Sequence, residues 1–193
     1  MKQFSIYLSG VGGQGIGLLS ETLLRAADYA GHSVKGVDTH GLAQRGGSVV
    51  SQIRIGSQVH TPLISRHQAD LLISLERHEA LRSLTEFAKE GATLIYYNTV
   101  WQPLDVRLGR VAEVSSKSLG DLCRQMGVKC IEVFHPDLED ARMQNVALLA
   151  RIDKEGLVPG VKSDHYRQAL KDLMAVSMLE KNMALYEAYR TAA

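Results

Sequence analysis

A glycine-rich segment close to the N-terminus has residue types and spacing that suit the binding of an anion. The segment 10–15 reads Gly-Val-Gly-Gly-Gln-Gly, and its candidate binding residues are Gly10, Gly12, Gly13, Gln14 and Gly15. Glycines allow a tight turn and a close approach of a ligand to the backbone. A helix that begins at Ile16 would add unpaired backbone N–H groups and the positive end of its dipole. The segment is therefore a candidate binding loop for a phosphate, a carboxylate or another anion.

A second polar loop, residues 40–47, carries the other candidate binding residues. It reads His-Gly-Leu-Ala-Gln-Arg-Gly-Gly, and its candidate residues are His40, Gln44, Arg45, Gly46 and Gly47. Arg45 offers a rigid fork of five donors, and the glycine pair lets successive backbone N–H groups curl around an anion. His40 could transfer a proton, contact an anion or only cap a turn. The loop could hold an anion, dock on acidic groups of a partner or serve as an ordinary surface turn.

Two interpretations of the first loop are open, and a third is excluded. The pattern Gly-x-Gly-x-x-Gly matches a dinucleotide fingerprint, and Asp38 lies about 20 residues on, where a ribose-binding acid would stand. The polar Gln14 at the apex of the loop and an interruption of the strand–helix alternation after it count against that interpretation. A P-loop is excluded because Leu18 and Leu19 stand where lysine and serine or threonine are required. The remaining interpretation is that the glycines only allow a helix to pack closely on a strand.

The periodicity of the apolar residues predicts the elements that position these loops. A strand over 4–9 leads into the glycines, a helix over 16–30 ends at Gly31, and a second strand covers 33–37. This order favours a parallel sheet with a crossover helix. Farther along the chain we expect strands over 70–74, 93–97, 110–114 and 128–133, and helices over 76–89 (ending at Gly91), 118–126 and 138–151.

A hairpin is predicted between the strand over 33–37 and the strand over 70–74. Residues 49–55 alternate between apolar and polar side chains, which is typical of a half-buried strand. Gly56 and Ser57 suit a two-residue type II′ turn, so the segment 58–64 is expected to return as the antiparallel partner.

The last third of the chain is predicted to be helical. After a loop over 156–160, a long amphipathic helix is expected to place Tyr166, Leu170 and the segment 179–183 on one face. We therefore predict an α/β fold in a single domain over residues 1–193. Its sheet would be Rossmann-like and mostly parallel, with an antiparallel hairpin and a long C-terminal helix.

The composition limits what this chain could do alone. Its 193 residues are 45% hydrophobic, and 22 basic against 21 acidic side chains give no support for a nucleic-acid partner. Two cysteines, Cys123 and Cys130, are too few for the four thiolates of an iron–sulfur cluster, and we expect both to be buried or semi-buried thiols without a metal. The sequence shows no Ser/His/Asp set, metal-spaced histidine pair, membrane span or secretory signal. We therefore predict a cytoplasmic chain with no catalytic residue and no metal site of its own.

The two loops together resemble a known family, the gamma-type subunits of 2-oxoacid:ferredoxin oxidoreductases. The motifs that carry the resemblance are Gly10-Val-Gly-Gly-Gln-Gly15, His40-Gly-Leu-Ala-Gln-Arg-Gly-Gly47 and Ile53-Arg-Ile-Gly56. It continues through 62–64, 69–70, 75–76, 79–82, Asn145 and 182–186, and the segment 115–126 fits it poorly. Within this family the sequence looks most like the beta subunit of indolepyruvate:ferredoxin oxidoreductase.

The resemblance implies a division of labour between subunits. The complex would oxidatively decarboxylate a 2-oxoacid to an acyl-CoA and pass the electrons to ferredoxin. Thiamine diphosphate and the iron–sulfur clusters would belong to a large partner subunit, and this chain alone would bind no cofactor. The two loops would face that partner, with CoA as a possible ligand at the interface. An arylpyruvate is the first expectation for the substrate and 2-oxoglutarate or a branched 2-oxoacid the second; an NAD(P)-dependent dehydrogenase and a ligand-binding module are alternatives of other classes.

Overall fold

The computed structural model describes residues 1–40, 47–101, 106, 108–110, 112–136, 138 and 140–191. These residues form a six-stranded sheet with the order β2-β3-β1-β4-β5-β6. The strands are β1 (Phe4–Val11), β2 (Val34–His40), β3 (Ser48–Ile55), β4 (Ala69–Ser74), β5 (Ala88–Tyr97) and β6 (Lys129–Val133). β1, β4, β5 and β6 pair in parallel, whereas β3 is antiparallel to both of its neighbours, β1 and β2. The mostly parallel sheet is confirmed.

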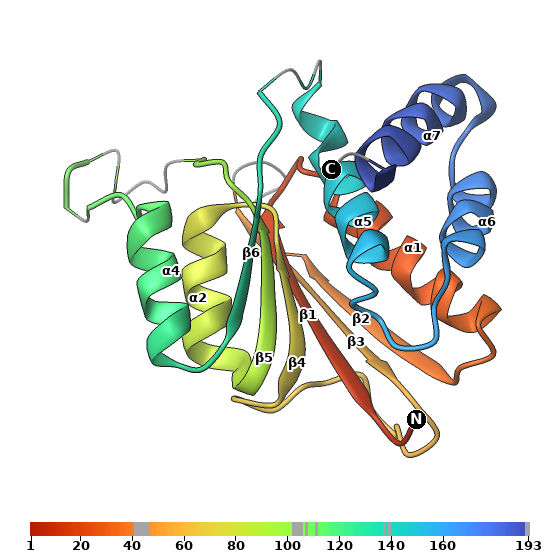
Figure 1. The fold of residues 1–193 in the computed structure, drawn as a ribbon. Coiled ribbons are helices and arrows are strands. Elements are labelled where there is room, and N and C mark those ends of the chain that lie inside the picture. Colours follow the sequence, from red (N-terminus) through yellow and green to blue (C-terminus); the bar gives the residue numbers. More distant parts are fainter. Residues whose placement is uncertain are drawn as a thin grey trace.

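Helices cover both faces of the sheet (Figure 1). One face carries α1 (Ile16–Tyr29), α5 (Gln144–Lys154), α6 (Ser163–Leu173) and α7 (Val176–Thr191). The other carries α2 (Arg77–Phe87) and α4 (Ser116–Gln125), and a short 3-10 turn, η1 (Ala141–Met143), precedes α5. The three layers explain why strand β4 is apolar almost throughout, since its side chains are buried on both faces.

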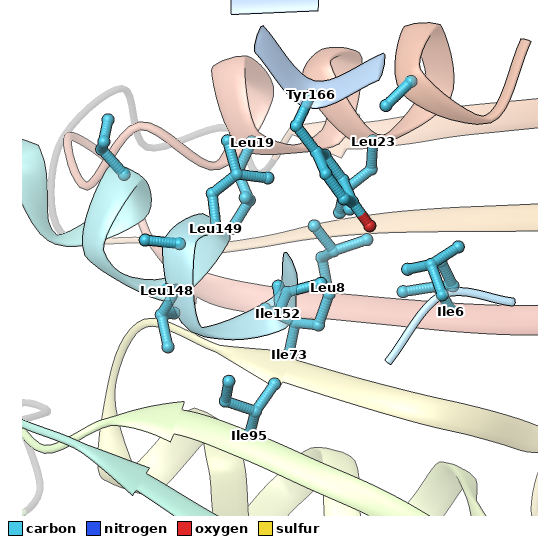
Figure 2. Packing of buried hydrophobic residues seen from close by; sticks show 14 of the residues in the cluster. Ile6, Leu8, Leu19, Leu23, Ile73, Ile95, Leu148, Leu149, Ile152 and Tyr166 are labelled. Carbon is cyan, nitrogen blue, oxygen red and sulfur yellow. The ribbon is translucent and has the colours of Figure 1, made fainter. Parts of the chain in front are cut away.

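Two apolar clusters lie on opposite faces of the sheet because successive strand residues point to opposite sides. In β1, Ile6 and Leu8 face the larger cluster and Tyr7 faces the smaller one. Figure 2 shows the larger cluster, in which Leu19 and Leu23 of α1 meet Leu148, Leu149 and Ile152 of α5 above the strands.

The antiparallel hairpin exists, but its second arm differs from the prediction. β3 pairs with β2 before it and with β1, and the segment 58–64 forms no strand. The backbone N–H groups of Gly56 and Ser57 donate to the carbonyls of Ser33 and Met1, at 2.9 and 3.4 Å. Residues after β3 are therefore tied to the ends of strands that are distant in sequence, and both edges of β3 are already used.

Three other expectations need correction. The predicted strand over 110–114 is wrong, since the residues of that segment that the structure describes (110 and 112–114) lie outside any strand. Helix α2 ends at Phe87, and Gly91, expected to stop it, lies within β5. The long helix divides into α6 and α7 because Met174 adopts an extended backbone, with φ −101° and ψ 136°.

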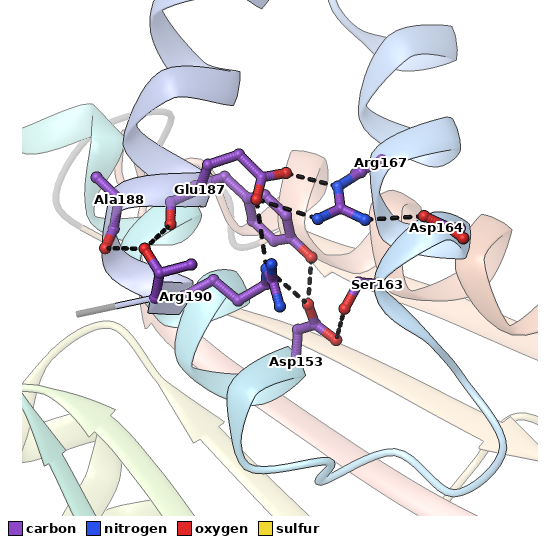
Figure 3. A network of polar contacts seen from close by, with 9 residues as sticks. Asp153, Ser163, Asp164, Arg167, Glu187, Ala188 and Arg190 are labelled. Carbon is purple, nitrogen blue, oxygen red and sulfur yellow. Dashed lines mark hydrogen bonds and ion pairs between the residues drawn. The ribbon is translucent and has the colours of Figure 1, made fainter. Parts of the chain in front are cut away.

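A network of polar side chains holds α7 against α5 and α6 (Figure 3). Asp153 of α5 accepts hydrogen bonds from the hydroxyls of Tyr186 and Ser163, at 2.6 and 3.0 Å. Arg167 of α6 donates to Glu187 of α7 at 2.5 Å. Burial raises the pKa of Tyr186, so this phenol stays protonated and acts as a donor.

Candidate functional site

The glycine loop and the end of β4 meet at the carboxyl edge of the sheet, the upper edge in Figure 1. The neighbouring strands β1 and β4 lead into helices on opposite faces, α1 and α2. In open α/β sheets such a reversal leaves a crevice beyond the carboxyl ends of the two strands, and ligands commonly bind there. The residues that line the crevice are therefore the first candidates for function.

The side chain of Gln14 bridges the ends of β1 and β4 at this edge. Its Oε1 accepts the backbone N–H of Val11 at 2.8 Å, and its Nε2 donates to the carbonyl of Leu75 at 2.7 Å. Nε2 also lies 3.4 Å from Oε1 of Gln144 at the start of α5. Only 1% of Gln14 is exposed. One amide thus joins the glycine loop, the residue after β4 and the start of α5.

Two of the glycines are required by close packing. A Cβ on Gly10 would lie 2.6 Å from Cδ1 of Ile16, and one on Gly15 would lie 2.5 Å from Nδ2 of Asn145. Gly15 also has φ +80°, and its carbonyl accepts a hydrogen bond from Asn145 at 3.1 Å. By contrast, nothing lies within 4 Å of the Cβ position of Gly13. The packing interpretation thus applies to Gly10 and Gly15, while Gly13 leaves backbone open to a ligand.

The position of Asp38 also disfavours the dinucleotide interpretation. Asp38 lies on β2, and β3 separates β2 from β1. With about 4.8 Å between neighbouring strands, the carboxylate is one strand farther from the glycine loop than in a fold whose first two strands are adjacent. Its Oδ1 accepts a hydrogen bond from Ser20 of α1 at 3.1 Å instead.

An open groove of about 460 Å³ lies beside the glycine loop. Its lining comes from the loop and α1 (Gly13, Gly15, Leu18), from the approach to α5 (Asp140, Arg142, Met143, Asn145) and from α7 (Ser177, Met178, Lys181, Asn182). Hydrogen bonds from Arg142 hold the pKa of Asp140 at about 2, so this carboxylate is ionised at neutral pH. Two cationic side chains against one carboxylate, next to the N-terminus of α1, suit an anionic ligand with apolar parts.

The structure brings the two predicted loops together at one point. The carbonyl of Gly47 accepts the backbone N–H of Gly12 at 2.9 Å. Gln44, Arg45 and Gly46 lie outside the described residues, and of His40 only the backbone, at the end of β2, is described.

Two buried carboxylates beside these loops were missed as site residues. Glu79 accepts a hydrogen bond from Ser48 at 2.9 Å, and Glu76 accepts the backbone N–H of Glu79 at the same distance. Both glutamates stand at the start of a helix: Glu76 caps α2, and Glu79 pairs with Arg82 at 3.3 Å. Burial raises the pKa of Glu79, while Arg82 and Ser48 oppose the rise. The sequence signal that could have shown their burial is their position within five residues of the end of a mostly apolar strand.

Exposed aromatic side chains complete this edge. Trp101, beyond β5, is 44% exposed and Phe134, beyond β6, is 56% exposed. Within the described part of the chain, no three His, Cys, Asp or Glu side chains gather where they could hold a metal ion. No described helix is long and apolar enough to cross a bilayer.

Known proteins resemble this chain over its whole length. The sequence profile of the pyruvate ferredoxin/flavodoxin oxidoreductase family matches residues 5–191. An indolepyruvate oxidoreductase subunit IorB of Archaeoglobus fulgidus is 31% identical over 196 aligned residues, which cover 98% of this chain and 96% of that one. A Thermococcus kodakarensis protein of the same name is 36% identical over 109 residues, so this chain spans about half (54%) of its length and the match covers 56% of this chain.

Solved structures share the fold. The gamma subunit of a keto/oxoacid ferredoxin oxidoreductase from Geobacter sulfurreducens superimposes with a TM-score of 0.66 at 20% identity, covering 97% of this chain and 96% of that one. A 2-oxoglutarate:ferredoxin oxidoreductase from Magnetococcus marinus, solved with 2-oxoglutarate, coenzyme A and succinyl-CoA, gives 0.68 at 17% identity. There the match covers all of this chain and 32% of the longer chain.

Proposed function

This chain belongs to the pyruvate ferredoxin/flavodoxin oxidoreductase family, and from that membership we propose that it is the gamma-type subunit of an indolepyruvate-type 2-oxoacid:ferredoxin oxidoreductase. The complex converts an arylpyruvate into an acyl-CoA and carbon dioxide and transfers two electrons to ferredoxin. The observation that carries the proposal is the end-to-end similarity to the IorB subunit of Archaeoglobus fulgidus.

In this proposal the redox cofactors belong to the large partner subunit. Thiamine diphosphate held there would supply the electron sink for decarboxylation, and iron–sulfur clusters would supply the path for the electrons. The described residues do not fit a cluster, because the chain has two cysteines and Cys123 is fully buried in an apolar layer. What this chain supplies is a rigid carboxyl edge, held by Gln14, against which the partner's site is shaped.

The carboxyl edge is the proposed contact with the partner. It combines the two loops with the exposed rings of Trp101 and Phe134. Aromatic side chains at the centre of an interface contribute strongly to affinity because they bury a large apolar area. The loop residues Gly12, Gly13, Gln44, Arg45 and Gly47 and His40 would lie at this interface.

We assign the groove beside Gly13 to an anionic group of CoA. Arg142 and Lys181 supply positive charge, and Leu18, Met143 and Met178 supply apolar surface. The open backbone at Gly13 and the start of α1 favour a phosphate there.

A branched-chain 2-oxoacid is the second candidate substrate. The ketoisovalerate oxidoreductase subunit VorA of Methanothermobacter thermautotrophicus is 28% identical over 194 aligned residues. These residues cover 95% of this chain and 35% of VorA. The partner's thiamine site would select between the two classes of substrate, so an assay of the complex with indolepyruvate and with ketoisovalerate separates them.

The proposal is tested by purifying the chain alone and with the large subunit of the same organism. Alone, it should contain no thiamine diphosphate or iron and should not turn over; together, indolepyruvate and CoA should drive reduction of ferredoxin. Turnover by the isolated chain, or tight binding of NAD(H) to it, would overturn the proposal. For the interface, Trp101→Ala should weaken association at least tenfold. Leu63→Ala, at an exposed leucine whose carbonyl lies beside Arg54 far from the carboxyl edge, is the matched control.

A further inference from the structure

The turn between α4 and β6 brings the chain's two cysteines into one apolar layer of the molecule. Gly127 has φ +65° and donates its N–H to the carbonyl of Arg124 at 3.3 Å, while Val128 donates to that of Cys123 at 2.9 Å. This pair of bonds is a Schellman motif, which ends the helix and reverses the chain within two residues. The strand that follows begins at Lys129, so Cys130 runs back alongside the last turn of α4.

Both side chains enter the apolar layer between the sheet and the helices α2 and α4. Cys123 is fully buried, and Cys130 is partly exposed and packs against the same cluster. A hydrogen-bonding interaction with Cys123 lowers the pKa of Cys130, helped by Arg124 and opposed by Glu132 and by burial, and the same interaction raises the pKa of Cys123. The partly exposed sulfur is thus the more nucleophilic of the two at neutral pH.

We propose that Cys123 and Cys130 are an oxidation site that forms an intramolecular disulfide in the presence of a peroxide. The thiolate of Cys130 attacks one oxygen of hydrogen peroxide, the O–O bond breaks, and Cys130 becomes a sulfenic acid as hydroxide leaves. The sulfur of Cys123 then attacks that of Cys130, the S–O bond breaks, and the thiol proton leaves with the hydroxyl as water. In total, two thiols lose two electrons, and one peroxide gives two waters. One tight turn joins the end of α4 to the start of β6, so both thiols lie in the same apolar layer, on the same side of the sheet.

This inference is independent of the proposed function, since it uses neither the carboxyl edge nor a partner. The disulfide would join the end of α4 to β6. β6 also carries Glu132, which accepts hydrogen bonds from Tyr96 at 2.7 Å and Asn98 at 2.6 Å. Oxidation would thus fix the outer edge of the sheet to its covering helix.

The test counts thiols in the full-length chain before and after treatment with hydrogen peroxide. The protein is unfolded, labelled with a maleimide and weighed by mass spectrometry. The count is unambiguous because the sequence holds two cysteines, and oxidation of methionines does not change it. We expect two labels before treatment, and none after it, with reversal by dithiothreitol. Two labels after treatment, or loss of label through disulfide-linked dimers on a non-reducing gel, would overturn the proposal.

Two matched variants assign the roles of the thiols. Cys123→Ser keeps a hydroxyl donor beside Cys130, so peroxide should stop at the sulfenic acid, which dimedone captures. Cys130→Ser leaves the buried Cys123, which should keep its one label under the same treatment. Equal oxidation of the two variants would contradict the assignment, and circular dichroism of each variant checks that it is folded.

Discussion

Two polar clusters in this molecule perform the same task with different chemistry. Gln14 joins the glycine loop, β4 and α5 at the carboxyl edge through neutral hydrogen bonds. On the outer helices, Asp153, Arg167, Glu187 and Arg190 join α5, α6 and α7 mainly through charged groups (Figure 3). Arg167 and Glu187 are partly exposed, so their charges keep much of their hydration, whereas Gln14 is enclosed. A neutral amide holds the crevice closed without neutralising the positive end of α1, which remains available to an anion in the adjacent groove.

The largest expected effect comes from removing the Gln14 amide. Gln14→Ala leaves the N–H of Val11 and the carbonyl of Leu75 buried without partners, and we expect a loss of about 3 kcal/mol in the free energy of unfolding. Urea denaturation measures it. Gln58→Ala, at an exposed glutamine, is the matched control and should change stability by less than about 0.5 kcal/mol. A loss below about 1 kcal/mol at Gln14 would mean that water replaces the amide, and the contrast between the clusters would fail.

A smaller loss is expected on the charged side. Asp153→Ala removes the acceptor of Tyr186 and Ser163, but Arg190 keeps its ion pair with Glu187 at 3.4 Å. We expect the free energy of unfolding to fall by about 2 kcal/mol, which urea denaturation again measures. Asp164 also pairs with Arg167, but the side chain of Asp164 is 90% exposed. Asp164→Ala should therefore change the free energy of unfolding by almost nothing. If the two variants were equally destabilised, the network would be no more than a set of surface ion pairs.

Glu79 tests the comparison within the carboxyl edge itself, because it is a buried carboxyl group close to the neutral hydrogen bonds of Gln14. Burial raises the pKa of Glu79 above its ordinary value of 4.5, so the native state binds this proton more tightly than the unfolded chain does. The stability that this protonation contributes is present at pH 4 and is lost as pH rises through the raised pKa. Relative to Glu79→Gln, which keeps an acceptor for Ser48, the parent protein should become less stable from pH 4 to pH 7. Urea titrations of both proteins at several pH values measure the difference, and a difference that is constant with pH would show that Glu79 is not desolvated.

The same contrast explains which features the sequence could predict. The glycine loop between β1 and α1 was predictable because a change from strand to helix periodicity occurs at Gly10–Gly15. The placement of β3 between β2 and β1 was not, because Gly56 and Ser57 carry a local turn pattern while their backbone N–H groups bond to Ser33 and Met1. Local patterns contain no information about such distant partners.

The split of the last helix has a similar origin. The apolar spacing continues through Met174, but the backbone there is extended, and α7 turns back to pack on α5. At the candidate site, the sequence placed a polar side chain at the apex of the loop. Where the amide of Gln14 would bond depended on Leu75 and Gln144, which are 61 and 130 residues away.

The smallest expected effect is on CoA binding in the groove beside the glycine loop. Arg142→Ala removes one of two cations from the groove, and in the complex with the large subunit we expect the KM for CoA to rise about threefold with kcat unchanged. The modest size follows from the exposure of Arg142, whose charge is screened by solvent and shared with Asp140. Arg25→Ala, an exposed arginine paired with Glu21 on the outer part of α1, should leave the KM unchanged. Steady-state kinetics at two ionic strengths checks the cause, because a contact between charges must weaken with salt in the parent protein and depend less on salt in the variant, which keeps Lys181. An unchanged KM would move the CoA contact away from this groove, while the Gln14 junction would keep only its structural role.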